Sequence, residues 1–484
     1  MVDPSVAEWY TQNVSHNIDS LKHFCGVVGI YSATPINIPA TLFFPLFSLQ
    51  HRGQESAGIA YRKTVDRTVV YKDIGMVSQV LTRYLEMERM SCLGIGHVRY
   101  STLGGNKIEN VQPIHVECNK GDIALAHNGN LSNSTAIKNH LFQGGSIFQT
   151  TSDSELFVHL ISRSVQPNFH LALIDALTQM QGAFSMVLMH DDSLYAVRDP
   201  YGFRPLYIGT KDDMTVVASE TCALDIMKVK EYREVKPGEL IRIDKNGTHS
   251  ETYAPVPVSQ RCIFELIYFA RPDSQVFGQS VHLRRKQMGM ALAGNDTVEA
   301  DIVVPVPDSG NSAALGYSEK ARVPLDYGLT RNHYAGRSFI MPTSAERELA
   351  VRMKLHPVRE VIEGKRIILV DDSLVRGTTA RILVKLLREA GAREIHLRLC
   401  SPEIRWPCFF GIDIPTRSEL ISNHKSPEEI AEYIGADTVM FLSLESLRNC
   451  VEDAEGYCYS CFSGKYCLPV NIMPEEQNMP RDAK

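Results

Sequence analysis

The sequence contains no run of the ~20 consecutive apolar residues that a membrane-spanning helix requires. It also lacks a large excess of charge of one sign, because 50 Lys and Arg stand against 56 Asp and Glu and give a formal net charge of -6 at pH 7. We therefore expect neither a membrane nor a nucleic acid as a partner. Its ligands must be inferred from individual sites.

The first 24 residues lack the basic start and the apolar core of a secretory signal. With no export signal, the eleven cysteines, an odd number, are expected to be reduced thiols or metal ligands rather than disulfides. These two features together predict a cytoplasmic protein.

No internal repeat is present, and 484 residues are too many for one ordinary core, so we expect two or three domains, of which two are large. Up to residue 255, strand-like runs are broken by turns and joined by a few helical patterns, which favours an α+β domain over 25–255. The proline-containing stretch 254–260 is typical of a linker. Beyond it, strongly apolar runs alternate with helical stretches, which predicts a parallel α/β sheet over 261–450. Residues 451–484 are expected to form a C-terminal segment with a loose tail.

Four polar, glycine-rich segments follow Cys25 in order: HRGQESAG, GHVRYST, HNGNL and TSDSE. Hydrolysis of an amide needs a nucleophile, a base, donors for the oxyanion and groups that hold both ends of the substrate. Arg99 can bind the α-carboxylate of glutamine and Asp153 its α-ammonium group. The Asn128 side chain and the Gly129 N–H can face the oxyanion. A single buried Cys is most often a core thiol, but this set favours Cys25 as a nucleophile.

A base for Cys25 is missing from this set. An α-amino group has a pKa of about 7.7–8.0, so a cysteine at the start of the chain carries its own base. We therefore expect residues 1–24 to be a propeptide that is removed, with Cys25 as the mature N-terminus.

The strand-like run KRIILV leads directly into DDSLVRGTT (371–379), and a helical pattern follows at once. Ser, Thr and Gly residues at the start of a helix bind phosphate well, because backbone N–H groups and the helix dipole both favour an anion. Asp371 and Asp372 repel phosphate, so their natural partners are ribose hydroxyls or Mg²⁺. No Gly-Lys-Ser/Thr follows, which excludes a Walker P-loop.

Taken together, CGVVGIYS, LQHRGQESAGIA, GHVRYSTLG, AHNGNL, TSDSE, GAFSMVLM and RDPYGFRPL resemble the glutaminase domain of N-terminal-nucleophile amidotransferases. IILVDDSLVRGTT resembles the phosphoribosyl pyrophosphate (PRPP) motif of type I phosphoribosyltransferases. Both together resemble the amidophosphoribosyltransferase family. The resemblance implies a four-layer αββα glutaminase domain followed by an α/β phosphoribosyltransferase domain. It also implies the transfer of ammonia from glutamine to PRPP at the entry to purine synthesis.

The resemblance assigns site residues by position. It implies that Cys25 is the nucleophile and that these residues serve glutamine: Arg52, Arg99, Asn128, Gly129 and Asp153. It implies that PRPP is bound by Asp371, Asp372, Ser373, Arg376, Gly377, Thr378 and Thr379, with Arg331 and Arg337 from a mobile loop over 331–342. One Mg²⁺ per subunit is implied at Ser309, Asp371 and Asp372. His333 stands in this loop where the family often has Arg.

The resemblance further implies purine nucleotides as feedback inhibitors and a homo-oligomer, either a dimer or a tetramer. Two other functions are weighed against it. A sugar-phosphate amidotransferase would lack DDSLVRGTT. A PRPP-sensing regulator without activity would lack an intact set of Cys25, Arg99, Asn128 and Asp153.

Cys458 and Cys461 form a C-x-x-C pair, which alone is consistent with a redox-active, a metal-binding or an accidental spacing. As part of a four-cysteine site, the spacing fits zinc as well as an iron–sulfur cluster. RCIFELIYFARPDS, WPCFFGIDIPTR and YCYSCFSGKY resemble the three cluster-binding segments in the iron–sulfur branch of the family. The resemblance implies one 4Fe-4S cluster per subunit, bound by Cys262, Cys408, Cys458 and Cys461. Its role would be structural, joining the start of the second domain to the C-terminal segment.

Overall fold

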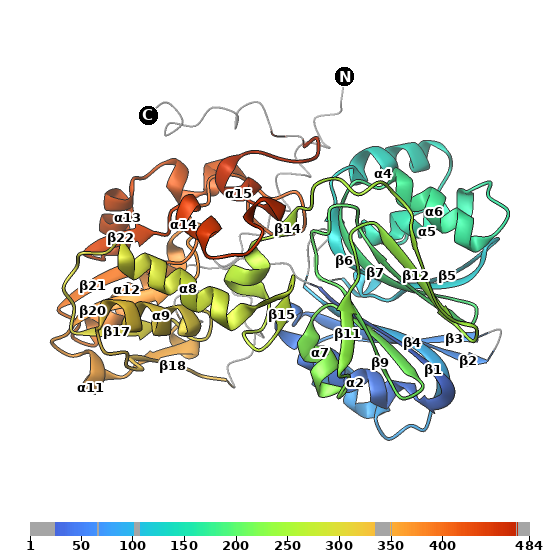
Figure 1. Cartoon of the computed structure of the whole chain (residues 1–484), viewed down its shortest axis with the longest axis horizontal. Coiled ribbons are helices and arrows are strands. Elements are labelled where there is room, and N and C mark those ends of the chain that lie inside the picture. Colours follow the sequence, from blue (N-terminus) through green and yellow to red (C-terminus); the bar gives the residue numbers. More distant parts are fainter. Residues whose placement is uncertain are drawn as a thin grey trace.

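The computed structural model describes residues 25–64, 67–100, 107–333 and 351–470, together with Leu349 and Ile472. The expected propeptide, Arg337 and most of the predicted loop over 331–342 lie outside these residues. Figure 1 shows two parts side by side, the first coloured blue to green and the second yellow to red. In the described part of the chain, no helix is long and apolar enough to cross a membrane.

Two antiparallel sheets form the centre of the first part. Among the described residues, one has seven strands and the other has six. The first sheet runs in the order β11 (Glu231–Glu234), β9 (Tyr207–Lys211), β10 (Met214–Ala218), β1 (Gly26–Asn37), β4 (Met90–Arg99), β2 (Ser56–Thr64), β3 (Arg67–Ile74). The second runs in the order β13 (Gly247–Thr252), β12 (Glu239–Asp244), β8 (Ser193–Arg198), β7 (Gly182–His190), β6 (Gly121–Leu131), β5 (Ile114–Cys118).

Strand β1 shows how the layers are built. Val27 points into the core between the two sheets, whereas Val28 and Ile30 join the core on the outer face, because successive side chains of a strand alternate. Helices α2 (Ile38–Ser48) and α7 (Thr221–Ile226) cover that outer face.

The outer face of the second sheet is covered by helices α5 (Ser154–Arg163) and α6 (Phe169–Gln179). In α5, Leu156, Phe157, Leu160 and Ile161 recur at helical spacing and are all buried. Helix α4 (Ser134–Gln143) lies beside α5. The order of layers is α, β, β, α, which confirms the predicted four-layer arrangement.

The second part is built on a parallel sheet of β17 (Ile302–Pro305), β20 (Arg366–Asp371), β21 (Glu394–Leu399) and β22 (Thr438–Phe441). Helices α8 (Val281–Gly294) and α9 (Asn311–Ala321) cover one face, and α12 (Thr378–Glu389) and α13 (Pro427–Ile434) cover the other. Because both faces are buried, these strands are mostly apolar, although β21 also buries His396 and Arg398. The predicted parallel α/β sheet is confirmed. Smaller elements are β15 (Gln275–Val276), β16 (Gln279–Ser280), β18 (Leu329–Arg331), β19 (Leu355–Pro357), α11 (Arg359–Ile362), α14 (Leu444–Asn449) and α15 (Ser460–Ser463).

The two parts are joined through the start of the second part and the end of the chain. Residues 254–260 have no regular structure and lead into β14 (Arg261–Cys262). β14 pairs in parallel with β23 (Tyr457–Cys458), so the C-terminal segment returns to the beginning of the second part. Phe203 of the first part stacks on Phe410 of the second, with ring centroids 4.4 Å apart.

Two glycines allow α8 and α9 to pack closely. A Cβ on Gly289 would lie 1.8 Å from the Ala313 carbonyl oxygen, and one on Gly316 would lie 1.9 Å from the Lys286 carbonyl oxygen. We predict that Gly289→Ala lowers the free energy of unfolding by about 1–3 kcal/mol, since overpacking forces the helices apart. Urea denaturation measures this loss.

Gly294→Ala in the same helix is the control, because among the described residues its added Cβ would meet only the flexible Lys320 side chain within 4 Å, at Cε, 3.9 Å away. Alanine forms helices better than glycine by roughly 1 kcal/mol, so this variant should be unchanged or slightly more stable. Equal losses in both variants would contradict the close packing of α8 and α9.

Candidate active sites

Cys25 lies directly before β1 and is 8% exposed. Its Sγ lies 3.8 Å from the Tyr100 carbonyl oxygen. Burial raises the pKa of the thiol to about 12, and the nearby Arg99 opposes only part of this rise. At neutral pH Cys25 is therefore protonated, and it needs a base close by to become a nucleophile.

Arg99 and Asp153 lie close enough to Cys25 for their charges to act on its thiol. Arg99 ends β4, the neighbour of β1, and is almost fully buried. Asp153 precedes α5, and its Oδ2 accepts the Leu131 N–H at 2.9 Å. A cation and an anion are thus held beside the thiol. This pair matches the carboxylate and ammonium groups of an amino acid.

Asn128 and Gly129 lie near the end of β6. Asn128 is 1% exposed, and within the described residues its Nδ2 has no hydrogen-bond partner. Because a buried amide without a partner costs free energy, this group is suited to bind a ligand. Gly129 has φ +154°, and a Cβ there would lie 1.9 Å from the Ala183 carbonyl oxygen, so only glycine fits. His97 of β4 contacts the His127 carbonyl oxygen at 3.1 Å, which holds this segment against the strand that ends in Arg99.

A second set of polar residues follows β20 at the carboxyl end of the parallel sheet. Strand β20 ends at Asp371, and α12 begins seven residues later at Thr378, preceded by Gly377 with φ +80°. The Ser309 hydroxyl donates to Asp371 Oδ1 at 3.3 Å. Burial, followed by the charge of Asp372, raises the pKa of Asp371 well above its usual range. A turn between a strand end and a helix start is where phosphate groups bind in α/β folds.

The remaining predicted residues of this site are placed as follows. Ser373 donates to Asp372, and the Arg376 guanidinium donates to Glu419 at 2.8 Å. Thr379 follows Thr378 in the first turn of α12. Arg331 ends β18 and donates to Asp308 at 2.5 Å, beside the segment that carries Ser309.

Comparison with known proteins identifies the family. A glutamine amidotransferase domain is matched at residues 97–225 and a phosphoribosyl transferase domain at residues 288–399. The amidophosphoribosyltransferase of Methanocaldococcus jannaschii is 45% identical over 468 residues, which cover 93% of this chain and 98% of that protein. The chain belongs to the amidophosphoribosyltransferase family.

Solved structures and plant relatives agree with this family. The glutamine PRPP amidotransferase from B. subtilis, solved in complex with ADP and GMP, has a TM-score of 0.85 and 44% identity and covers 93% of this chain and 99% of that chain. Amidophosphoribosyltransferase 2, chloroplastic, of Arabidopsis thaliana is 47% identical over 462 residues, covering 94% of this chain and 81% of that protein.

The activity of this amidophosphoribosyltransferase is the transfer of ammonia from glutamine to PRPP, which gives 5-phosphoribosylamine, glutamate and pyrophosphate in the first step of purine biosynthesis. The predicted order of a glutamine amidotransferase domain and a phosphoribosyltransferase domain is confirmed. The two other functions weighed from the sequence, another sugar-phosphate acceptor and an inactive sensor, do not fit this family.

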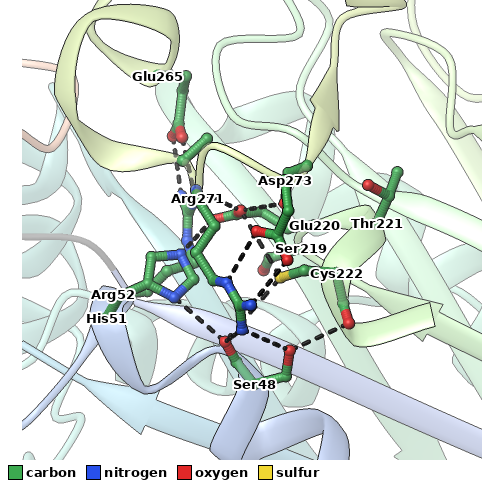
Figure 2. A network of polar contacts seen from close by, with 12 residues as sticks. Ser48, His51, Arg52, Ser219, Glu220, Thr221, Cys222, Glu265, Arg271 and Asp273 are labelled. Atoms are coloured by element: carbon green, nitrogen blue, oxygen red, sulfur yellow. Dashed lines mark hydrogen bonds and ion pairs between the residues drawn. The ribbon is translucent and has the colours of Figure 1, made fainter. Parts of the chain in front are cut away.

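Arg52 lies in an environment that does not suit the expected contact with glutamine. It is fully buried, and its Nε donates to the Cys25 carbonyl oxygen at 3.1 Å. Its two terminal nitrogens donate to Glu220 at 2.5 Å and to Glu265 at 2.8 Å, as Figure 2 shows. Burial alone would lower the pKa of Arg52, but the two carboxylates outweigh it and raise the pKa. With its guanidinium bound in this way, Arg52 supports the backbone of Cys25.

The four cysteines predicted to bind a cluster gather where β14 pairs with β23. Cys262 and Cys458 are aligned in this pairing. Burial and then Cys408, Cys458 and Cys262 raise the pKa of the Cys461 thiol, so all four thiols are within electrostatic range. Yet in the described ranges no three His, Cys, Asp or Glu side chains are arranged to hold a single metal ion. A zinc site needs Zn–S distances of about 2.3 Å, whereas a cluster binds each cysteine to a different iron and spaces them further apart.

The residues that join the two domains beside Cys25 were not predicted from the sequence. Glu220 accepts from Arg52 and from the backbone N–H of Arg271, and Glu265 accepts from Arg52 and Arg204. Asn130 donates to the Phe409 carbonyl oxygen at 2.9 Å. One signal was present, because Glu265 is the only charged residue in the apolar run CIFELIYF, and a lone charge in such a run needs a buried partner.

Proposed function

We propose that Cys25 begins the mature chain and is the nucleophile for glutamine hydrolysis. Support comes from the position of the buried Cys25 thiol beside Arg99 and Asp153. Burial raises the pKa of this thiol to about 12, so a base is needed to remove its proton. The α-amino group of a terminal Cys25 is such a base, and it lies close to the thiol because both groups belong to the same residue. It takes the Sγ proton as the sulfur attacks the glutamine amide carbon.

The other residues hold the substrate and the developing charge. Arg99 binds the α-carboxylate of glutamine, and Asp153 binds its α-ammonium group. Asn128 Nδ2 and the Gly129 N–H donate to the oxyanion that forms on the amide oxygen. The amine returns its proton to the leaving nitrogen, and ammonia departs. Water then hydrolyses the thioester to glutamate and regenerates the thiol.

Ammonia from this site displaces pyrophosphate at C1 of PRPP in the second domain. We propose that the phosphate and ribose groups are held by Asp371, Asp372, Ser373, Arg376, Gly377, Thr378 and Thr379. Ser309, Asp371 and Asp372 carry oxygen ligands that would hold Mg²⁺, and when bound this ion would offset the charge of the leaving pyrophosphate. The loop over 331–342, with Arg331 and Arg337, would close over PRPP and exclude water.

Family membership also supports proposals for the domain bounds, the cluster, the inhibitors and the assembly of this chain. We assign residues 25–255 to the glutaminase domain, 261–450 to the phosphoribosyltransferase domain and 451–484 to a C-terminal segment. A 4Fe-4S cluster would be bound by the four gathered cysteines. The B. subtilis enzyme was solved in complex with ADP and GMP, which supports purine nucleotides as inhibitors here. We further propose that the chain forms a homo-oligomer.

The terminal-amine mechanism predicts that the active protein begins at Cys25. Only a terminal Cys25 has its own base, so cleavage before it should precede activity. Intact mass spectrometry of active protein measures the start of the chain. Full glutamine-dependent activity in protein that still carries residues 1–24 would show that the base is another group.

Variants of the two sites should affect glutamine hydrolysis and phosphoribosylamine synthesis differently. Cys25→Ala should abolish glutamine-dependent synthesis and leave ammonia-dependent synthesis within about twofold, because only hydrolysis needs the thiol. Asp371→Asn with Asp372→Asn should lower synthesis from both nitrogen sources, because PRPP and Mg²⁺ lose their carboxylates. Pyrophosphate release measures both rates. Normal ammonia-dependent turnover in the double Asp variant would overturn the assignment of the PRPP site.

The cluster predicts about four irons per chain in protein purified without oxygen, together with a brown colour. Cys458→Ser should lower the iron content, because it removes one ligand. Cys467→Ser is the control, since Cys467 follows the C-x-x-C pair without belonging to the proposed set. Iron and zinc analysis decides the matter, and stoichiometric zinc without iron would exclude the cluster.

A further inference from the structure

Glu265 belongs to the phosphoribosyltransferase domain, but its carboxylate reaches the glutaminase site. It is fully buried, and its Oε1 accepts from Arg52 Nη2 at 2.8 Å and from Arg204 Nη1 at 3.2 Å, while its Oε2 accepts from Arg52 Nη1 at 3.0 Å. The Arg52 Nε donates in turn to the Cys25 carbonyl oxygen at 3.1 Å. One guanidinium thus connects a carboxylate of the second domain to the backbone of the proposed nucleophile. Figure 2 shows the contact between Arg52 and Glu265.

The element that carries Glu265 is itself held rigidly. Residues Glu265–Phe269 form a single π-helical turn, η4, a feature that occurs often at functional sites. The buried Arg285 of α8 donates to the Leu266 carbonyl oxygen at 2.9 Å and to the Ala270 carbonyl oxygen at 2.8 Å. These two bonds fix both ends of the turn to the second domain. Glu265 can therefore hold Arg52 in one place.

One of the two carboxylates that are seen to compensate the charge of Arg52 comes from the second domain. Glu220 of the first domain supplies one carboxylate, and Glu265 supplies the other at a position with no access to water. Removing one partner of a buried ion pair leaves an uncompensated charge, so Arg52 would have to move. Because its Nε holds the Cys25 carbonyl, the nucleophile would move with it.

We propose that Glu265 is a positioning residue for glutamine hydrolysis, which acts on Cys25 through Arg52 and makes the glutaminase site complete only when the second domain is docked. This inference rests on the proposed role of Cys25 as the nucleophile. A displacement of the nucleophile by about 1 Å can lower a rate by roughly 100-fold. The bidentate contact of Glu265 with Arg52 is thus a means by which one domain sets the rate in the other.

The test compares Glu265→Gln with Arg271→Gln in the full-length enzyme. Arg271 crosses the same interface, since its Nη1 donates to the Ser48 carbonyl oxygen and hydroxyl at 3.2 Å. Among the described residues, its side-chain hydrogen bonds go to Ser48 and Asp273 and not to Arg52 or Cys25. Glu265→Gln should lower kcat for glutamine hydrolysis by at least about tenfold, as a displaced nucleophile requires. It should leave ammonia-dependent synthesis within about twofold. Arg271→Gln should change neither rate by more than about twofold.

Labelling of Cys25 by iodoacetamide separates positioning from general loosening. A loosened interface would expose the thiol and speed its alkylation, whereas a displaced but buried thiol should be labelled no faster than in the parent. Arg52→Lys and the double variant complete a mutant cycle. The double variant should be no slower in glutamine hydrolysis than the slower single variant, because both changes break the same link.

Three results would overturn the inference: a normal kcat for glutamine in Glu265→Gln, equal loss of both activities, or additive effects in the cycle. A different result would show that Cys25 is not the nucleophile, because Cys25→Ala would then retain glutamine-dependent activity. If Cys25→Ala is inactive with glutamine while Glu265→Gln matches the parent, only the positioning role is wrong.

Discussion

The arrangement of the two domains depends on the buried ion pairs that Arg52 forms with Glu220 and Glu265. None of these side chains is exposed, so their charges are compensated by one another rather than by water. Burial alone would raise the pKa of Glu220, but His51 and Arg52 outweigh it and keep the pKa low. The carboxylate is therefore charged at neutral pH. Such a cluster has a low free energy only when all members are present, which ties the docking of the domains to the geometry around Cys25.

Both proposed reaction sites lie where strands end, so their polar side chains are held by the ordered backbone of a sheet. Arg99 is the last residue of β4, and Asp371 is the last residue of β20. Strand pairing fixes the backbone up to these residues, so their side chains need little further ordering before a ligand binds. The apolar cores behind them are formed from alternating strand positions in the first domain and from strands with both faces buried in the second. The antiparallel sheet of the first domain and the parallel sheet of the second thus each place a charged side chain of a reaction site at the end of a strand.

Sequence patterns were sufficient for the main features of the fold. The three- and four-residue spacing of apolar side chains predicted α5, and the apolar run KRIILV predicted the buried strand β20. The helical pattern that follows DDSLVRGTT also predicted α12, which begins at Thr378 after Gly377 with φ +80°. The contacts of Arg52 were out of reach, because its partner Glu265 lies 213 residues away. No pattern in either segment specifies which distant charge will pair with it. Spacing along the chain also left zinc and a cluster as alternatives, since it does not give distances between sulfur atoms.

The parallel pairing of β14 with β23 can form only after nearly the whole chain has been translated. Cys262 opens the second domain, while Cys458, its partner in the pairing, is translated roughly 200 residues later. At about 5–20 residues per second, a ribosome needs some ten to forty seconds to cover that stretch. The sheets of the first domain can form during this time, but the edge of β14 must wait for the end of the chain. A nascent chain therefore carries an unpaired strand edge and an unprotected Cys262 until translation is nearly finished, which leaves this junction open to wrong pairing with other chains.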